Sequence, residues 1–311
     1  MKVLVTGGAG FIGSNFVEMA LSGHFPAISE IVVLDKLTYA GKISNLSFAV
    51  NNPNFYFIQG DICDSEIVAI AMLNVDAVIN FAAESHVDRS IVDSSDFIKT
   101  NILGTHVLLE AARKKGISRF IQISTDEVYG SIESGSWDEN SPLLPNSPYS
   151  ASKAAADLLV RSYFITHSLN VNITRCSNNF GPRQDQEKLI PNFISKIQNN
   201  SKVSLYGDGL NVRDWLYVDD HCRAIYLVLT EGKSGETYNI GGGEELPNLE
   251  LARILLDLFG KDTSSIQFIK DRLGHDRRYS INWEKIAKLG YRPRGIFYEN
   301  LQKTVQWYTQ I

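Results

Sequence analysis

The chain has 311 residues, of which 44% are hydrophobic and 21% are charged, and its formal net charge is −5. This length and composition predict a folded globular protein of roughly two domains and exclude a disordered chain. The acidic balance argues against a nucleic-acid-binding face, and no apolar run approaches the ~18 residues of a membrane-spanning helix.

Residues 2–6 form a strand-like apolar run directly after Met1, so we expect no signal peptide. The three cysteines, Cys63, Cys176 and Cys222, form no C-x-x-C pair, and the six histidines form no H-x-x-x-H pair. These spacings argue against a disulfide framework and suggest no metal site. We therefore expect a reducing, cytoplasmic location, with Cys176 serving as a small buried residue.

Short apolar runs alternate with helix-like segments through the first half of the chain. The helix-like segments include residues 101–115 and 150–168, and in the second of these apolar side chains recur at helical spacing. Strand–helix–strand repetition predicts an α/β fold with a doubly wound, Rossmann-type parallel sheet. We expect its strands at residues 2–6, 30–35, 55–59, 77–81, 119–124 and 171–175.

The rhythm changes after about residue 178, where Asn, Gly, Pro and Lys become more frequent. We expect a smaller, partly interleaved C-terminal α/β domain for substrate. The predicted boundaries are 1–179 for the first domain, with 211–240 returning to it, and 180–210 with 241–311 for the second. The expected elements are a helix at 213–230, a strand at 236–240, and helices at 248–259, 283–289 and 298–311.

A glycine-rich loop follows the first expected strand. Gly7, Gly10 and Gly13 have G-x-x-G-x-x-G spacing, and an amphipathic segment follows them. Such glycines let the backbone approach a pyrophosphate that faces a helix N-terminus. Asp35 ends the second expected strand at about the spacing of a ribose-binding carboxylate, and an acid there favours NAD over NADP.

Two further strand ends have alternative interpretations. Asp61 suits either a contact near adenine or an ordinary helix cap. The small residues of Phe81-Ala82-Ala83 suit either a cofactor lying close by or tight packing of a helix on the sheet.

Tyr149 and Lys153 form a Y-x-x-x-K pair at the start of the 150–168 helix, after a proline-rich loop. This spacing puts both side chains on one helix face. A nearby ammonium favours the phenolate, so we expect Lys153 to lower the pKa of Tyr149 and let it accept a hydroxyl proton.

The fifth expected strand leads directly into Thr125, Asp126 and Glu127. Ligands of open α/β sheets bind at the carboxyl ends of the strands. Adjacent carboxyl groups at this edge suit one acid and one base, whereas the alternative is a solvated loop.

These motifs together resemble the extended short-chain dehydrogenase/reductases that act on nucleotide sugars, and among them the dTDP-glucose 4,6-dehydratases. The Asp-Glu pair is the most specific feature, because related epimerases usually lack it. In place of a proline usual in the family, this chain has Leu273. The resemblance rests on TGGAGFIGS (6–14), DKLTYAG (35–41), FAAESHVDRSI (81–91), STDEVYG (124–130), SPYSASKAAAD (147–157), RCSNNFGPRQ (175–184), EKLIPNFI (187–194), RDWLYVDDH (213–221) and GHDRRYSI (274–281).

The resemblance implies a lyase that retains NAD and is redox-neutral overall. Tyr149 would take the proton of the sugar C4 hydroxyl while Lys153 holds the nicotinamide ribose. Thr125 would hydrogen-bond the C4 oxygen. Glu127 would then remove the C5 proton, and Asp126 would protonate the departing C6 hydroxyl, giving a 4-keto-6-deoxy sugar.

The resemblance also implies further contacts. Besides the glycines, Asp35, Tyr149 and Lys153, the cofactor side would comprise Phe11, Ile12, Lys36, Thr38, Asp61, Ile62, Phe81, Ala82, Ala83, Ser85, Thr100 and Asn179. The nucleotide sugar would contact Ser85, Thr125, Asn178, Lys188, Leu189, Tyr206, Arg213, Asn239, Arg272, His275, Arg277 and Tyr279. Arginine suits a diphosphate because it makes bidentate oxyanion contacts.

Other functions remain open from the sequence. One is a 4-epimerase, another is a dehydratase of a UDP- or CDP-linked sugar, and a third is a catalytically inactive dinucleotide-binding regulator, which would be expected to lose the catalytic side chains. We expect His86 to be structural, since Tyr149 and Glu127 already fill both basic roles. By analogy with relatives, helices 101–115 and 150–168 would form a homodimer interface.

Overall fold

A seven-stranded sheet forms the larger lobe of the computed structural model, which describes residues 1–310. The strand order is β10-β6-β5-β4-β1-β2-β3, and every neighbouring pair is parallel. The predicted doubly wound, Rossmann-type sheet is therefore confirmed. The strands are β1 Lys2–Thr6, β2 Glu30–Asp35, β3 Phe55–Gln59, β4 Ala77–Asn80, β5 Arg119–Thr125, β6 Val171–Cys176 and β10 Thr237–Ile240.

Helices cover both faces of this sheet, which explains its uninterrupted apolar strands. In β1, Val3 and Val5 face one hydrophobic core, whereas Leu4 faces the other. The first core is completed by α1 (Phe11–Leu21), η1 (Ile43–Ala49) and α8 (Val218–Glu231). The second is completed by α2 (Ser65–Ala71), α5 (Thr105–Lys115) and α6 (Pro148–His167).

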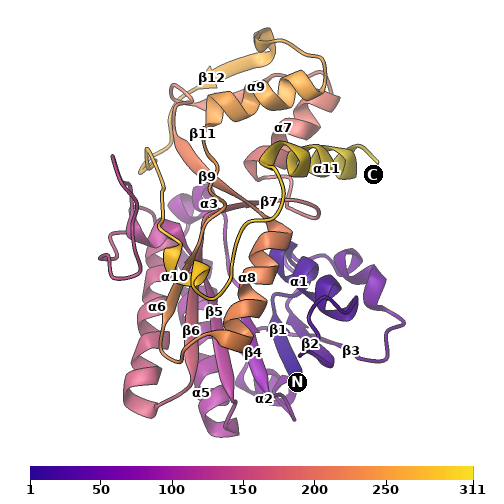
Figure 1. Cartoon of the computed structure of the whole chain (residues 1–311), viewed down its shortest axis with the longest axis vertical. Coiled ribbons are helices and arrows are strands. Elements are labelled where there is room, and N and C mark those ends of the chain that lie inside the picture. The colour runs from indigo at the N-terminus through magenta and orange to yellow at the C-terminus, as the bar shows by residue number, and fades with distance from the viewer. Residues whose placement is uncertain (311) are drawn as a thin grey trace.

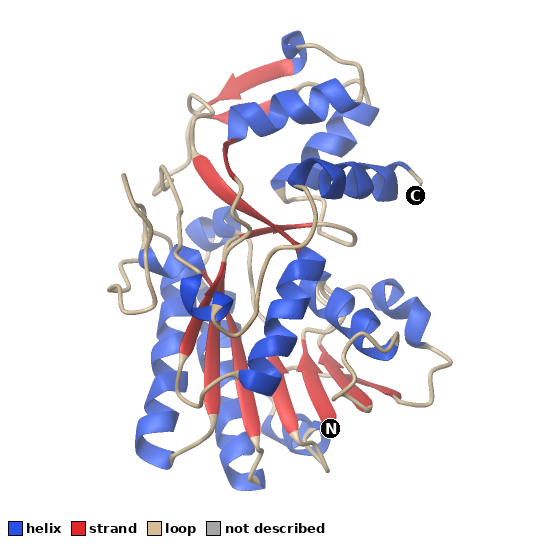
Figure 2. Ribbon diagram, in the orientation of Figure 1, coloured by secondary structure: helices blue, strands red, loops and turns tan. Residues whose placement is uncertain are grey.

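The smaller lobe lies at the top of Figure 1 and has its own core. Phe180 packs there against the rings of Trp215, Tyr217 and Phe297. Figure 2 shows that the lobe combines helices with short strands. One sheet has the order β11-β9-β7 and another pairs β12 with β8. The elements are β7 Asn178–Phe180, α7 Leu189–Gln198, β8 Val203–Tyr206, β9 Val212–Tyr217, β11 Glu245–Pro247, α9 Asn248–Leu258, η4 Thr263–Ser265, β12 Ile266–Ile269 and α11 Phe297–Thr309. Helix α10 (Glu284–Ala287) packs instead against β10 of the larger lobe (Figure 1), and its Ile286 belongs to the first core of that lobe.

The expected helix at residues 213–230 is wrong in its first part. Residues up to Tyr217 form strand β9, and α8 begins only at Val218. β9 pairs in parallel with β7 and antiparallel with β11. Because these pairings join segments distant in the sequence, local periodicity cannot reveal them.

The other expected helices lie close to their predicted positions. The helix at 101–115 starts earlier, with α4 (Ser95–Phe97) and a π-helical segment, η2 (Ile98–Gly104), leading into α5. The helix expected at 298–311 is α11, and residue 311 lies outside the described residues. Within residues 1–310, no helix is both long enough and apolar enough to cross a membrane.

Candidate active site

Most of the predicted functional residues converge on one cavity at the carboxyl ends of the parallel strands. The segments after β1, β2, β4 and β5 open into it, together with the start of α6 and residues beyond β6. The predicted residues that line it are Gly7, Gly10, Phe11, Ile12, Gly13, Asp35, Lys36, Thr38, Asp61, Ile62, Phe81, Ala82, Ala83, Ser85, Thr100, Thr125, Asp126, Glu127, Tyr149, Lys153, Asn178, Asn179 and Lys188.

The glycine loop is held close to neighbouring backbone. Gly7 has a φ of +68°, and a Cβ there would lie 2.6 Å from the backbone nitrogen of Ala82. A Cβ on Gly13 would lie 2.4 Å from the carbonyl oxygen of Gly7. Helix α1 begins directly after Gly10, which provides no side-chain cap for its first N–H groups. This cradle fits the pyrophosphate of a dinucleotide.

Asp35 is positioned by its own loop. One carboxylate oxygen accepts from the N–H of Ala9 at 2.9 Å, and the other accepts from that of Leu37 at 2.8 Å. Burial raises the pKa of Asp35, and these two hydrogen bonds oppose the rise. Beside it, Lys36 forms a 2.9 Å ion pair with Asp61. The carboxylates at the ends of β2 and β3 suit hydroxyl-bearing ligands and disfavour a 2′-phosphate.

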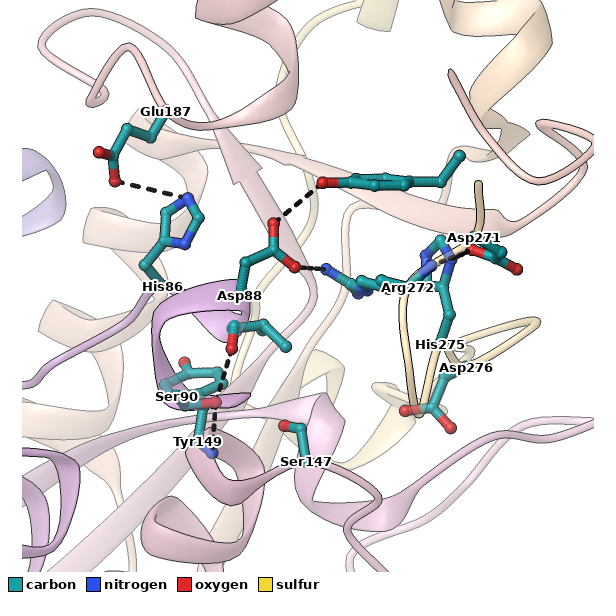
Figure 3. A network of polar contacts seen from close by, with 12 residues as sticks. His86, Asp88, Ser90, Ser147, Tyr149, Glu187, Asp271, Arg272, His275 and Asp276 are labelled. Atoms are coloured by element: carbon teal, nitrogen blue, oxygen red, sulfur yellow. Dashed lines mark hydrogen bonds and ion pairs between the residues drawn. The ribbon is translucent and has the colours of Figure 1, made fainter. Parts of the chain in front are cut away.

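Helix α6 starts where its local sequence dictates. Ser147 and Ser150 form a reciprocal capping box around Pro148 in the first turn. The N–H of Tyr149 also donates to Ser90 Oγ at 3.2 Å (Figure 3). These contacts fix the helix start, so Tyr149 and Lys153 both face the cavity.

The expected effect of Lys153 on Tyr149 is absent. Burial, followed by the charge of Glu127, raises the pKa of Tyr149 well above its usual value. The Lys153 ammonium instead donates to the carbonyl oxygen of Ile123 at 2.6 Å, and burial lowers the pKa of Lys153. The prediction considered only the nearby ammonium, whereas Tyr149 is also buried and close to the charges of Glu127 and Asp126.

A 3₁₀ turn, η3 (Asp126–Tyr129), presents the carboxyl pair. Thr125 caps it by accepting from the N–H of Glu127 at 3.2 Å, and its hydroxyl donates to Asp126 Oδ1 at 3.2 Å. Asp126 is buried, and its Oδ2 has no partner within the described chain. Asp126 is therefore enclosed rather than solvated, whereas Glu127 is half-buried.

The two carboxyl groups have different electrostatic surroundings. Burial raises the pKa of Asp126 well above its usual value, and the charges of Glu127 and Asp214 add to this rise. Burial also raises the pKa of Glu127, but cationic side chains oppose the rise. These cations are Arg272, Lys188 and Arg213. Asp126 is thus the better proton donor and Glu127 the better base.

Several predicted substrate residues of the smaller lobe lie near Glu127, but they are not among the residues that line the cavity. The Arg213 guanidinium stacks 4.3 Å from the ring centre of Tyr279. The Tyr279 hydroxyl donates to Asp276 at 2.7 Å and lies 3.5 Å from Glu127 Oε2. A nucleotide sugar between the lobes would thus meet cationic and aromatic groups beside the base.

Polar contacts link the two lobes around Asp88 (Figure 3). Asp88, on α3 (Val87–Val92), accepts from the Tyr206 hydroxyl at 3.2 Å and lies 3.8 Å from Arg272. His275 pairs with Asp271 at 2.6 Å. His86 Nε2 lies 3.5 Å from a Glu187 carboxylate oxygen, in keeping with the expected structural role.

A sequence profile of the GDP-mannose 4,6 dehydratase family matches residues 4–304. The chain belongs to this family. It is 53% identical to a dTDP-glucose 4,6-dehydratase of an Actinoplanes strain, over 99% of this chain and 98% of the relative. It is also 52% identical to a low-salt glycan biosynthesis protein of Haloferax volcanii, over 99% and 98% of the two chains. The family resemblance predicted from the motifs is confirmed.

Solved structures place both dehydratases and epimerases on this fold. The dTDP-glucose 4,6-dehydratase DesIV of Streptomyces venezuelae, with NAD and TYD bound, superposes with a TM-score of 0.98 at 54% identity, covering 100% of this chain and 97% of that one. A UDP-glucose 4-epimerase of Thermus thermophilus in complex with NAD superposes with a TM-score of 0.91 at 33% identity, covering 99% of each chain. The fold alone therefore does not separate the two activities in this family, and the side chains of the site must do so.

Two predicted substrate residues, Asn239 and Arg277, lie outside the cavity lining and make polar contacts with other parts of the protein. Asn239 is fully buried, and its side chain accepts from the Tyr129 hydroxyl and donates to the carbonyls of Trp137 and Asn282. Arg277 is exposed and pairs with Asp208 at 2.7 Å. The motif match gave Asn239 a ligand role, but its hydrogen-bonding capacity is already used within the protein. Leu189, Tyr206, His275 and Arg272 are also outside the cavity lining.

The sequence analysis missed some residues of the cavity wall, namely Glu84, Ser124, Cys176, Ser177, Gln184 and Asp185. Each lies within or next to one of the sequence motifs given above. Its position beside predicted site residues could therefore have indicated that it lines the cavity. Asn248, at the start of α9, lies outside the cavity lining. It follows Pro247, whose strand pairs alongside Arg213, and its buried Oδ1 has no partner within the described chain.

Proposed function

We propose that this chain converts dTDP-glucose to dTDP-4-keto-6-deoxyglucose and water. The observation that carries the proposal is the Asp126–Glu127 pair, in which Asp126 is buried and Glu127 half-buried, in the same cavity as Tyr149 and Lys153. Relatives with more than half of their residues identical bear the name dTDP-glucose 4,6-dehydratase. An inactive regulator would have no reason to keep a buried carboxyl oxygen without a partner among the described residues next to a second carboxyl group.

NAD is the proposed cofactor, held by the glycine loop, Asp35 and the strand ends that line the same half of the cavity. When bound, NAD+ would accept a hydride from the sugar C4 and later return it to C6. NAD should copurify with the protein, and NADP should not replace it, because Asp35 repels a 2′-phosphate. A purified protein that prefers NADP in titrations would contradict this assignment.

The oxidation half-reaction needs a base at the C4 hydroxyl. Tyr149 takes that proton as a phenolate, a state that the positive charge of bound NAD+ would favour against the effect of burial, and Thr125 hydrogen-bonds the C4 oxygen from the end of β5. Lys153 lies one helical turn beyond Tyr149, where it orients the ribose. The C4 ketone that results acidifies the hydrogen on C5.

Elimination then uses the carboxyl pair. Glu127 removes the C5 proton, and Asp126 gives its proton to the C6 hydroxyl, which leaves as water. The C5–C6 double bond is reduced at C6 by the returning hydride and protonated at C5 from Glu127. The proton taken from the C4 hydroxyl finally replaces the one that Asp126 lost, so the protons balance. Adjacent acid and base suit adjacent carbon atoms.

The nucleotide diphosphate is proposed to lie toward the smaller lobe. Arg213, Arg272, Lys188 and Tyr279 support this placement, since they bring cations and an aromatic ring next to Glu127. Ser85, Asn178, Leu189, Tyr206 and His275 complete the proposed set. Asn239 is left out of this set because its side chain is already hydrogen-bonded within the protein.

The two-domain division is also proposed, with boundaries at 1–179 plus 211–240 and at 180–210 plus 241–311. The positions of α8 in the first core and of β10 at the edge of the large sheet support the return of the chain to the first domain, although β9, at the start of the 211–240 segment, pairs within the smaller lobe. Limited proteolysis should cut at these junctions before it cuts within either domain. Early cleavage inside the seven-stranded sheet would contradict the boundaries.

We propose a cytoplasmic homodimer formed through η2, α5 and α6. These elements contact one another and expose apolar side chains, namely Ile98, Leu103, Leu158 and Ile165. Exposed apolar residues that cluster in this way are typical of an interface. Light scattering should give twice the chain mass, and a monomer at micromolar concentration would contradict the proposal.

The activity is tested with purified protein and dTDP-glucose. Alkali should develop the absorbance of a 4-keto-6-deoxy sugar, whereas a Tyr149→Phe control should develop none. Parallel incubations with UDP-glucose and CDP-glucose test the base preference. A 4-epimerase would instead yield the C4 epimer without that absorbance, and an inactive regulator would leave the sugar unchanged.

A further inference from the structure

A buried polar network lies directly beneath the turn that carries the carboxyl pair. Asp157 and Arg175 form an ion pair at 2.9 Å, with side chains 1% and 7% exposed. Arg175 also donates to the hydroxyl of Tyr129 at 2.8 Å, and that hydroxyl donates to Asn239 at 2.8 Å. Tyr129 is the last residue of η3 and is fully buried.

The network joins both sets of reactive groups. Asp157 lies on α6 at helical spacing from Tyr149 and Lys153, so the three share one helix face. Arg175 pairs in register with Ser124, which precedes the acid–base turn. Asn239 pairs in register with Arg175 on the next strand. One chain of contacts thus runs from the oxidation helix to the elimination turn.

The Tyr129 hydroxyl is the central member of this chain. Burial raises the pKa of Tyr129 to about 12, so the phenol keeps its proton and donates to Asn239. The Arg175 guanidinium also lies 4.8 Å from the centre of the Tyr129 ring. Asn239 is anchored in turn by the carbonyls of Trp137 and Asn282. The end of η3 is thus fixed from several directions.

Stability alone does not account for the network. Buried ion pairs often contribute no more to stability than well-packed apolar side chains would, because both charges are desolvated. Directional hydrogen bonds do more than apolar packing to fix an orientation. Elimination requires Asp126 to act at the C6 hydroxyl while Glu127 acts at C5. The rate of this step therefore depends strongly on how η3 is oriented.

We propose that the Tyr129 hydroxyl, held between Arg175 and Asn239, is a positioning group that aligns the acid–base turn with the helix carrying Tyr149 and Lys153. The inference rests on the proposed dehydration. It assigns Asn239 to positioning rather than to substrate contact. Removal of the hydroxyl will impair elimination while leaving C4 oxidation largely intact.

The test is a single-turnover experiment on Tyr129→Phe protein with its bound cofactor. The absorbance of reduced nicotinamide reports C4 oxidation as it rises and the later steps as it decays. Because misplacement by about 1 Å can cost ~10²-fold in rate, we expect decay to slow by about 10- to 100-fold and the rise by less than about threefold. Solvent deuterium entry at C5 should fall with the decay.

Tyr238→Phe is the matched control. Tyr238 is buried on the same strand as Asn239, and its hydroxyl accepts only the N–H of Lys233 among the described residues, at 2.9 Å. This variant should keep both phases at wild-type rates. A Tyr129→Phe protein in which both phases slow equally, or neither slows, would overturn the positioning role.

Arg175→Lys provides a second variant that keeps the charge opposite Asp157. A single ammonium does not reproduce the guanidinium fork, so the same selective loss of elimination is expected. If both variants lose cooperative thermal unfolding, the network is part of the structural framework and the proposal is wrong. Wild-type protein that fails to dehydrate dTDP-glucose would contradict the proposed function itself, whatever the variants do.

Discussion

The cofactor half and the sugar half of the cavity are built in different ways. The cofactor half consists of turns directly after consecutive strands, and its shape depends on backbone contacts such as that between Gly7 and Ala82. The sugar half combines Glu127 with cations from segments distant in the sequence, including Arg213 and Arg272. Backbone contacts determine the shape of the cofactor half, whereas charged side chains determine the electrostatics of the sugar half.

This difference has consequences for substitutions. In the cofactor half, adding a methyl group where backbone segments touch should weaken binding without altering protonation. In the sugar half, neutralising a charge should alter proton transfer while leaving the shape intact. The following experiments test this contrast, from the largest expected effect to the smallest.

The largest effects should come from the carboxyl pair. Asp126→Asn keeps the shape but removes the transferable proton, so water loss should slow by about 10²–10⁴-fold. C4 oxidation should persist, and reduced nicotinamide should therefore accumulate. Stopped-flow absorbance measures both steps.

Glu127→Gln is the partner experiment. It should slow removal of the C5 proton and reduce solvent deuterium entry at C5 more than Asp126→Asn does, if elimination is stepwise. A concerted elimination would make the two variants alike. Wild-type dehydration in Asp126→Asn would show that the pair has no role as acid and base.

Tyr149→Phe should stop the reaction before any reduced nicotinamide forms. Loss of the base at the C4 hydroxyl should lower turnover by about 10²-fold or more while the fold is kept. Steady-state rates and circular dichroism measure the two outcomes. Near-normal turnover would reject Tyr149 as the initiating base.

Gly13→Ala tests the cofactor half. Its methyl group would lie 2.4 Å from the Gly7 carbonyl oxygen, so the loop must shift. If relieving this contact costs the bound state about 1.4 kcal/mol, NAD affinity should fall by about tenfold. Calorimetric titration should show this loss with little change in dTDP affinity.

Arg213→Lys is the reciprocal variant in the sugar half. It keeps a positive charge but loses the planar group stacked on Tyr279, so dTDP affinity should fall while NAD affinity holds. Equal losses of both ligands in either variant would contradict the separation between the halves.

The smallest effect should appear in the pH dependence of stability. Burial raises the pKa of Asp126, so the folded state retains this proton after the unfolded chain has lost it. The free energy of unfolding should therefore fall as pH rises from the usual aspartate range toward the raised pKa. Asp126→Asn removes this contribution and should therefore be more stable than wild type at alkaline pH. Urea denaturation across the pH range measures it, and parallel curves for the two proteins would contradict it.

The cofactor half was accessible to sequence reasoning because its signals are local. A glycine triplet after a strand and an acid at the next strand end each report on a few neighbouring residues. The same holds for Tyr149 and Lys153, which share a helix turn. For Asn239 and Arg277 the motif match predicted a substrate role without any information about the internal contacts that these side chains make.

The sequence by itself determined the parallel sheet, the glycine loop and the reactive residues, since strand runs, helix caps and close spacings are encoded locally. Only the tertiary structure decided that residues 212–217 form a strand, because that strand exists through pairing with distant segments. The tertiary structure also decided how readily the phenol and the two carboxyl groups of the site hold a proton. Burial and the surrounding charges raise the pKa values of Tyr149 and Asp126, and they set Asp126 apart from Glu127. A pKa depends on every charge and dipole packed around the group, and these meet only when the chain is folded.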